Sequence, residues 1–100
     1  MDNFSYSASK AGVHMLTRHL AAELLPDILV NAIAPGLFPS RMTKMVLAAG
    51  PEAVGAHLPL GRIGRPDDMA GIAVFLASRA STYITGAVIP VDGGVSTLSR

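Results

Sequence analysis

The sequence predicts an α/β protein, and the order of its segments leads to that assignment. A segment compatible with a helix, Ser5–Leu25, is followed by a continuous apolar run, Ile28–Ala34. A second helix candidate starts near Arg65 and leads into a short strand candidate, Ala87–Val91. Helices that alternate with strands are typical of α/β folds with a parallel sheet. Two strands are fewer than the roughly 5–6 of an average sheet, so this order predicts the second half of a larger fold.

The first predicted helix contains no Pro and one Gly, and Pro26 follows it directly, where a helix is expected to end. At about 100° per residue, its apolar residues fall on two opposite faces. Because a helix that is apolar on two faces is buried on two sides, we expect a neighbour on each side. The broad face holds Tyr6, Ser9, Lys10, Val13, Leu16, Thr17, Leu20 and Leu24, and the opposite face holds Ala8, Ala11, Gly12, Met15 and Ala22.

The remaining elements follow from local composition. The run Ile28–Ala34 shows little alternation, which is typical of a strand buried on both faces. The segment from Leu37 to Pro66 is rich in Pro and Gly, and we expect only short helices within it, near 41–49 and 52–57. A long irregular segment in a compact domain is usually a lid or a binding segment. The sequence Arg65-Pro66-Asp67-Asp68 predicts the start of a helix that extends to Ser78, and we expect Arg62 and Arg65 to have structural roles there.

Composition and charge exclude several classes of protein. The chain has 100 residues, a net charge of +1 and no cysteine. The near-zero charge argues against a nucleic-acid partner, and the lack of cysteine excludes disulfides and thiol catalysis. No apolar stretch is long enough for a membrane helix, and the first residues lack the basic start of a signal peptide, so a cytoplasmic location is expected. His14 and His19 diverge around the helix, and the sequence predicts no metal site.

The apolar content is high for a small soluble domain. Half of the residues are hydrophobic and only 15% are charged, whereas about 25% charged residues is usual. The mean hydropathy is +0.44. Because the membrane option fails, this excess predicts a covering partner, which is either another subunit or the rest of a longer chain.

Tyr6 and Lys10 form the most suggestive pair of polar residues. They are four residues apart and therefore lie on one face of the predicted helix. A phenol is a weak acid at neutral pH, and a nearby ammonium group favours the phenolate and lowers the phenol pKa. Such a pair suits general acid–base catalysis, and the ammonium group is also able to hold a hydroxyl of a bound cofactor. The alternative is that the two residues are merely neighbours on a helix face, because a Tyr-x-x-x-Lys spacing is common.

Six motifs in order give the pair a context. Together they strongly resemble the carboxyl-terminal part of the short-chain dehydrogenase/reductase family, over nearly the whole chain. The motifs are Tyr6-Ser7-Ala8-Ser9-Lys10-Ala11, Val30-Asn31-Ala32-Ile33-Ala34-Pro35-Gly36, Arg62-Ile63-Gly64-Arg65-Pro66-Asp67-Asp68, Ala73-x-Phe75-Leu76-Ala77-Ser78, Tyr83-Ile84-Thr85-Gly86 and Val91-Asp92-Gly93-Gly94.

The resemblance implies a Rossmann-type doubly wound parallel sheet, of which this chain is the carboxyl-terminal half. It implies that Tyr6 is the catalytic proton donor or acceptor, and that Lys10 binds the nicotinamide ribose and lowers the Tyr6 pKa. It places the Pro35-Gly36 turn beside the nicotinamide, Phe38 where the backbone meets the carboxamide, and Ser40 at a hydroxyl contact. The resemblance further implies NAD or NADP as the cofactor, whose nicotinamide carries the hydride.

The resemblance also implies a substrate loop over residues 37–65, where Met42, Met45 and Val46 are candidates to line an apolar pocket for a small carbonyl or alcohol substrate. The complete enzyme is expected to be a homodimer or homotetramer. Residues 1–100 lack the Gly-rich turn that holds a pyrophosphate and the family's catalytic Ser, so we expect a partial domain that is inactive alone. Two alternatives stay open, a non-catalytic interaction or oligomerisation fragment and an unrelated small α/β binding module.

Overall fold

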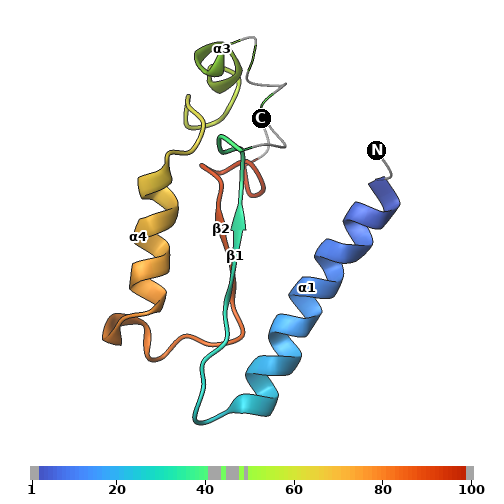
Figure 1. Cartoon of the computed structure of the whole chain (residues 1–100), viewed down its shortest axis with the longest axis vertical. Coiled ribbons are helices and arrows are strands. Elements are labelled where there is room, and N and C mark those ends of the chain that lie inside the picture. Colours follow the sequence, from blue (N-terminus) through green and yellow to red (C-terminus); the bar gives the residue numbers. More distant parts are fainter. Residues whose placement is uncertain (1–2, 41–43, 45–47, 49, 99–100) are drawn as a thin grey trace.

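The computed structural model describes residues 3–40, 44, 48 and 50–98 of the chain. Its elements follow the order helix, strand, short helix, helix, 3₁₀ turn and strand. Two parallel strands stand between two helices, with α1 on one side and α4 on the other (Figure 1). The α/β assignment from the sequence is therefore confirmed.

Helix α1 extends over Asn3–Leu24, close to the bounds expected from the sequence. Two of its residues are buried, Thr17 at 6% exposure and Ala21 at 4%. Ala21 packs beside Gly86, since a Cβ placed at Gly86 would lie 3.6 Å from the Ala21 Cβ. The carboxyl-terminal half of α1 is therefore anchored near the turn that precedes the second strand.

Strands β1 (Ala32–Pro35) and β2 (Val88–Val91) pair in parallel, with Ala32 opposite Val88 and Pro35 opposite Val91. The prediction of a strand over Ile28–Ala34 was wrong at both ends, because the ladder starts at Ala32 and includes Pro35.

The late start of β1 has a local cause in the residues before it. The Val30 N–H donates to Thr85 Oγ1 at 3.0 Å, and the Gly86 N–H donates to the Val30 carbonyl at 2.7 Å. The Asn31 amide donates to the Ile84 carbonyl and accepts from the Ala87 N–H, both at 3.0 Å. These residues hold the turn before β2 instead of forming ladder pairs.

Helix α4 (Pro66–Leu76) begins where the sequence predicts. The Arg65 N–H donates to Asp68 Oδ2 at 2.7 Å, which satisfies one of the free donors at the helix start. The helix α3 (Pro51–Gly55) falls within the expected range 52–57 apart from its first residue, and the 3₁₀ turn η1 (Arg79–Ser81) follows α4. The expected helix near 41–49 lies mostly outside the described residues.

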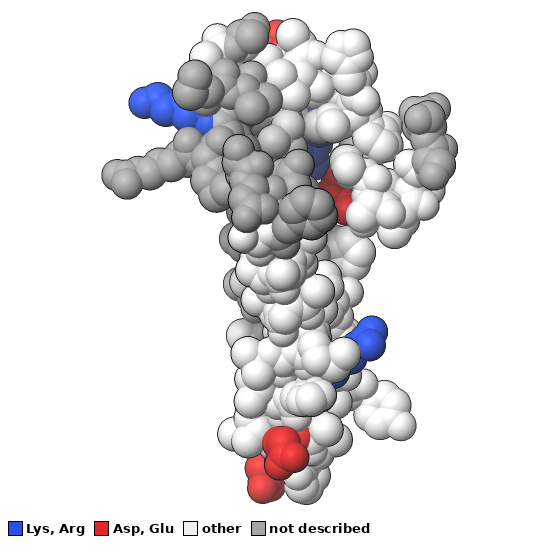
Figure 2. Space-filling model, turned by 90° about the vertical axis from the view of Figure 1, so that its right-hand side faces the viewer, with Lys and Arg blue, Asp and Glu red and all other residues white. Residues whose placement is uncertain are grey.

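Helix α4 lies against one face of β1. A hollow of about 400 Å³ between them is lined by Leu29, Asn31, Ile33, Ala73, Leu76 and Ala77. The described part of the chain buries few side chains, and many large apolar residues are exposed, including Val13 at 53% and Val74 at 69%. Figure 2 shows a face on which charged side chains are few. None of the described helices is both long and apolar enough to cross a membrane.

Candidate functional site

Helix α1 carries Tyr6 and Lys10 near its amino-terminal end. The buried residues Thr17 and Ala21 define the stripe of the helix that faces the strands. Lys10 precedes Thr17 by about two helical turns, and Tyr6 precedes Lys10 by about one, so both positions continue this stripe. Lys10 is exposed, and the side chain of Tyr6 lies outside the side chains that the structure describes.

The end of the molecule that holds these two positions is also where both strands end. Helix α1 runs antiparallel to β1, so its amino terminus lies toward the carboxyl ends of β1 and β2 (Figure 1). In open parallel α/β sheets, ligands bind at the carboxyl ends of the strands. The topology therefore places Tyr6 and Lys10 at the edge where a ligand is expected.

The turn after β1 occupies the same end. The Gly36 N–H donates to the Val91 carbonyl at 3.0 Å, and the Gly64 N–H donates to the Leu37 carbonyl at 2.8 Å. Phe38 is half-buried and its ring lies against Gly64. Of the predicted cofactor-binding residues, the structure brings Pro35, Gly36 and Phe38 into one turn at this edge, followed by the exposed Ser40.

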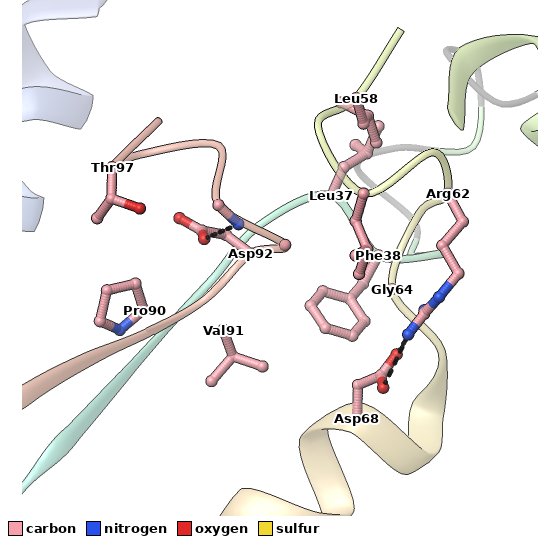
Figure 3. A pocket seen from close by; sticks show the side chains of 13 residues that line it. Leu37, Phe38, Leu58, Arg62, Gly64, Asp68, Pro90, Val91, Asp92 and Thr97 are labelled. Carbon is pink, nitrogen blue, oxygen red and sulfur yellow. Dashed lines mark hydrogen bonds and ion pairs between the residues drawn. The ribbon is translucent and has the colours of Figure 1, made fainter. Parts of the chain in front are cut away.

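A cavity of about 350 Å³ lies beside this turn (Figure 3). Its walls come from the turn after β1, the return of the predicted substrate loop, the start of α4 and the residues that follow β2. Its lining comprises Leu37, Phe38, Leu58, Leu60, Arg62, Gly64, Asp68, Pro90, Val91, Asp92, Gly93, Gly94 and Thr97. The candidates Met42, Met45 and Val46 lie outside the described residues.

An ion pair closes one side of the cavity. Arg62 Nη1 donates to Asp68 Oδ2 at 2.8 Å, Nη2 donates to Oδ1 at 3.3 Å, and Nη1 also donates to the Ile63 carbonyl at 3.0 Å. The hydrogen bond from Arg62, followed by that from the Arg65 N–H, lowers the pKa of Asp68 to about 2. The same hydrogen bond raises the pKa of Arg62. The structural role expected for Arg62 is confirmed, because Arg62 ties the end of the predicted substrate loop to the start of α4.

Asp92 lies on the other side of Phe38 in the view of Figure 3. Its carboxylate accepts from the Gly94 N–H at 2.9 Å and from the Ser96 N–H at 3.1 Å. Hydrogen bonds from the Ser96 side chain and then from these N–H groups lower the pKa of Asp92. Sequence patterns gave no role to Asp92 or Gly64, although both stand in motifs of the resemblance. Their proximity to the turn is visible only in the fold.

This edge combines the positions of Tyr6 and Lys10 on α1 with the turn after β1. A family model described as Enoyl-(Acyl carrier protein) reductase, which represents the carboxyl-terminal region of the short-chain dehydrogenase/reductase family, matches residues 1–96. The chain belongs to the short-chain dehydrogenase/reductase family.

Individual relatives agree with the family. The rhamnolipids biosynthesis 3-oxoacyl-[acyl-carrier-protein] reductase of Pseudomonas aeruginosa is 52% identical over 95 residues, which is 91% of this chain and 37% of that protein. The L-tagatose-forming galactitol 2-dehydrogenase of Cereibacter sphaeroides is 48% identical over 94 residues, with 90% and 37% covered. The chain thus spans little more than a third of the length of these relatives.

The solved structure of the Pseudomonas aeruginosa RhlG/NADP active-site complex superimposes with a TM-score of 0.82 at 50% identity. The match covers 95% of this chain and 40% of that one. The fold of the described residues is therefore the carboxyl-terminal part of the family's Rossmann-type fold.

Proposed function

We propose that this chain supplies the proton-handling residues and the nicotinamide-end turn of an NAD(P)-dependent oxidoreductase that interconverts a carbonyl and an alcohol. One observation carries the proposal. The sheet-facing stripe of α1, fixed by Thr17 and Ala21, continues to Lys10 and Tyr6 at the edge where the β1 turn lies.

In this proposal Tyr6 donates a proton to the substrate carbonyl oxygen during reduction and removes it from the alcohol during oxidation. Lys10, one turn away on the same stripe, favours the phenolate and holds a ribose hydroxyl. The Pro35-Gly36 turn, the Phe38 backbone and Ser40 orient the amide end of the cofactor. The nicotinamide supplies the hydride when it is bound, and the chain's own residues supply the proton, the orientation and the charge.

The substrate loop over residues 37–65, including Met42, Met45 and Val46, is proposed to cover a small carbonyl or alcohol substrate. The relatives named above act on a 3-oxoacyl thioester and on a sugar alcohol, so the proposal extends to the shared carbonyl/alcohol chemistry. The sequence leaves the choice between NAD and NADP open, and the cytoplasmic location and the homodimeric or homotetrameric assembly stay predictions.

A chimera tests the proposal directly. It joins the amino-terminal portion of the Pseudomonas aeruginosa 3-oxoacyl reductase to this chain at the start of the matched region, and turnover of a 3-oxoacyl thioester with NADPH is measured. Tyr6→Phe keeps the ring and removes the hydroxyl, so turnover is expected to fall by about 10²–10⁴-fold. Tyr83→Phe is the matched control, because Tyr83 is fully exposed and its change is chemically identical. Equal turnover in the two variants would remove Tyr6 from the mechanism.

The exposed apolar residues of α1 support a second candidate, a non-catalytic interaction or oligomerisation fragment. Val13 and Leu16 on the broad face are 53% and 55% exposed, and Met15 on the opposite face is 51% exposed, so both faces suit docking. The chimera separates the two functions. Activity that depends on Tyr6 favours the enzyme. A chimera that folds but is inactive, and whose assembly mass changes when α1 is altered, favours the interaction fragment.

A further inference from the structure

The turn Gly36-Leu37-Phe38 is held from two sides by residues that are distant in the chain. On one side stands Asp92, directly after β2, and on the other stands Gly64, two residues before α4. We call Gly36, Phe38, Gly64 and Asp92 the turn clamp. Phe38, Gly64 and Asp92 line the cavity of Figure 3, and Gly36 lies against Asp92.

The backbone of Gly36 lies directly against the Cα and Cβ atoms of Asp92. A Cβ placed on Gly36 would lie 2.6 Å from the Asp92 Cβ and 2.7 Å from its Cα. Asp92 has little freedom to retreat, because its carboxylate accepts from two N–H groups of the following turn, those of Gly94 and Ser96. Asp92 thereby fixes how closely β2 approaches the turn.

Gly64 meets the other end of the turn. Its N–H donates to the Leu37 carbonyl at 2.8 Å, and a Cβ on Gly64 would overlap the ring of Phe38. The residue before Gly64 is held in turn, because Arg62 donates to the Ile63 carbonyl and to Asp68. The φ of Gly64 is not positive, so close approach to the ring, and not backbone conformation, explains the glycine.

We propose that the turn clamp positions the Phe38 backbone for hydride transfer, with Gly64 and Asp92 as positioning residues that do not touch the reacting atoms. The inference rests on the proposed function, which places the amide end of the cofactor at this turn. A displacement of about 1 Å at a reacting group costs about 10²-fold in rate. A methyl group at Gly64 would overlap the ring of Phe38, and it acts at this scale when the displaced ring carries the Phe38 backbone with it.

The test compares three variants of the chimera. Gly64→Ala perturbs the clamp, and Gly71→Ala is the matched control, because a Cβ at Gly71 meets nothing within 4 Å. The double variant Phe38→Leu with Gly64→Ala returns space to the methyl group and is expected to restore part of the loss. The readouts are the single-turnover rate of hydride transfer, the Kd for NADPH, and amide hydrogen exchange of residues 36–40 without cofactor.

We expect Gly64→Ala to slow hydride transfer at least about tenfold, to change the Kd for NADPH only a few-fold, and to speed exchange in residues 36–40. A rate and an exchange pattern equal to those of Gly71→Ala would overturn the proposal. If Gly64→Ala fails to fold, Asp92→Asn decides, since it keeps the shape of the side chain and replaces one of its two acceptor oxygens by an NH2 donor. An unchanged rate in that variant also overturns the proposal. Tyr6→Phe in parallel keeps the two proposals separate, because only its normal turnover counts against the proposed function.

Discussion

Replacement of Gly36 by Ala is expected to open the carboxyl end of the sheet. The added Cβ would lie 2.6 Å from the Asp92 Cβ, whereas carbon atoms in favourable contact lie about 3.5–4.0 Å apart. The segments that contain Gly36 and Asp92 must therefore separate by roughly 1 Å. Both atoms are attached directly to the backbone, so no rotation of a side chain relieves the overlap.

The cost follows from two contributions. Overpacking of a tight contact costs about 1–3 kcal/mol. The separation also stretches the bond from the Gly36 N–H to the Val91 carbonyl, now 3.0 Å, and a backbone hydrogen bond contributes about 0.5–1.5 kcal/mol. We therefore expect the free energy of unfolding to fall by about 2–4 kcal/mol, a large part of the roughly 5–15 kcal/mol that stabilises a domain.

Urea unfolding of the chimera, followed by circular dichroism, measures this loss. Gly36→Ala should lower the midpoint without changing the slope, which reports the surface exposed on unfolding. Gly71→Ala should raise the midpoint slightly, because Ala is favoured over Gly in a helix by about 1 kcal/mol and its Cβ meets nothing. Equal midpoints for the two variants would refute the contact between Gly36 and Asp92.

Three further predictions concern charge, assembly and the isolated chain. The pKa of Asp68 is lowered from 3.8 to about 2, so its ion pair with Arg62 contributes fully above about pH 4 and is lost as the pH falls through 2. Asp68→Asn should therefore show a smaller fall in the urea midpoint between about pH 5 and pH 2, and an unchanged pH profile would contradict this. Ala11→Glu combined with Ala22→Glu should shift the chimera toward monomer in sedimentation, and an unchanged mass would contradict an interface on that face of α1. The 100-residue chain alone should show no tight binding of NADH or NADPH in calorimetry, because it lacks a Gly-rich pyrophosphate turn, and micromolar binding would disprove this.

The helices were predictable because their signals are local. The absence of Pro through α1 and the Pro66-Asp67-Asp68 start of α4 determine both elements within a few residues. The four-residue spacing of Tyr6 and Lys10 likewise fixes their shared helix face. The start of β1 was not predictable from its apolar run, because the hydrogen bonds of Asn31 with the turn after η1 decide it.

Local sequence patterns did not predict the turn clamp either. Gly64 and Asp92 stand in recognisable motifs, yet nothing in either motif says that they meet Phe38 and Gly36. A glycine with a negative φ cannot be recognised as necessary from the sequence, because what requires it is the atom that lies against its Cα. Contacts between segments far apart in the chain therefore needed the fold, and they are the contacts that hold the candidate site.

The surface of the chain connects its stability with its proposed chemistry. The chain exposes 7620 Å², whereas a folded monomer of 10.3 kDa is expected to expose about 5,400 Å². Part of this surplus lies on α1, where Val13 and Leu16 are 53% and 55% exposed. Thr17 and Ala21 anchor the carboxyl-terminal half of the helix, whereas Tyr6 and Lys10 stand in the amino-terminal half. We therefore expect a partner that covers Val13 and Leu16 to fix also how closely the positions of Tyr6 and Lys10 approach the β1 turn.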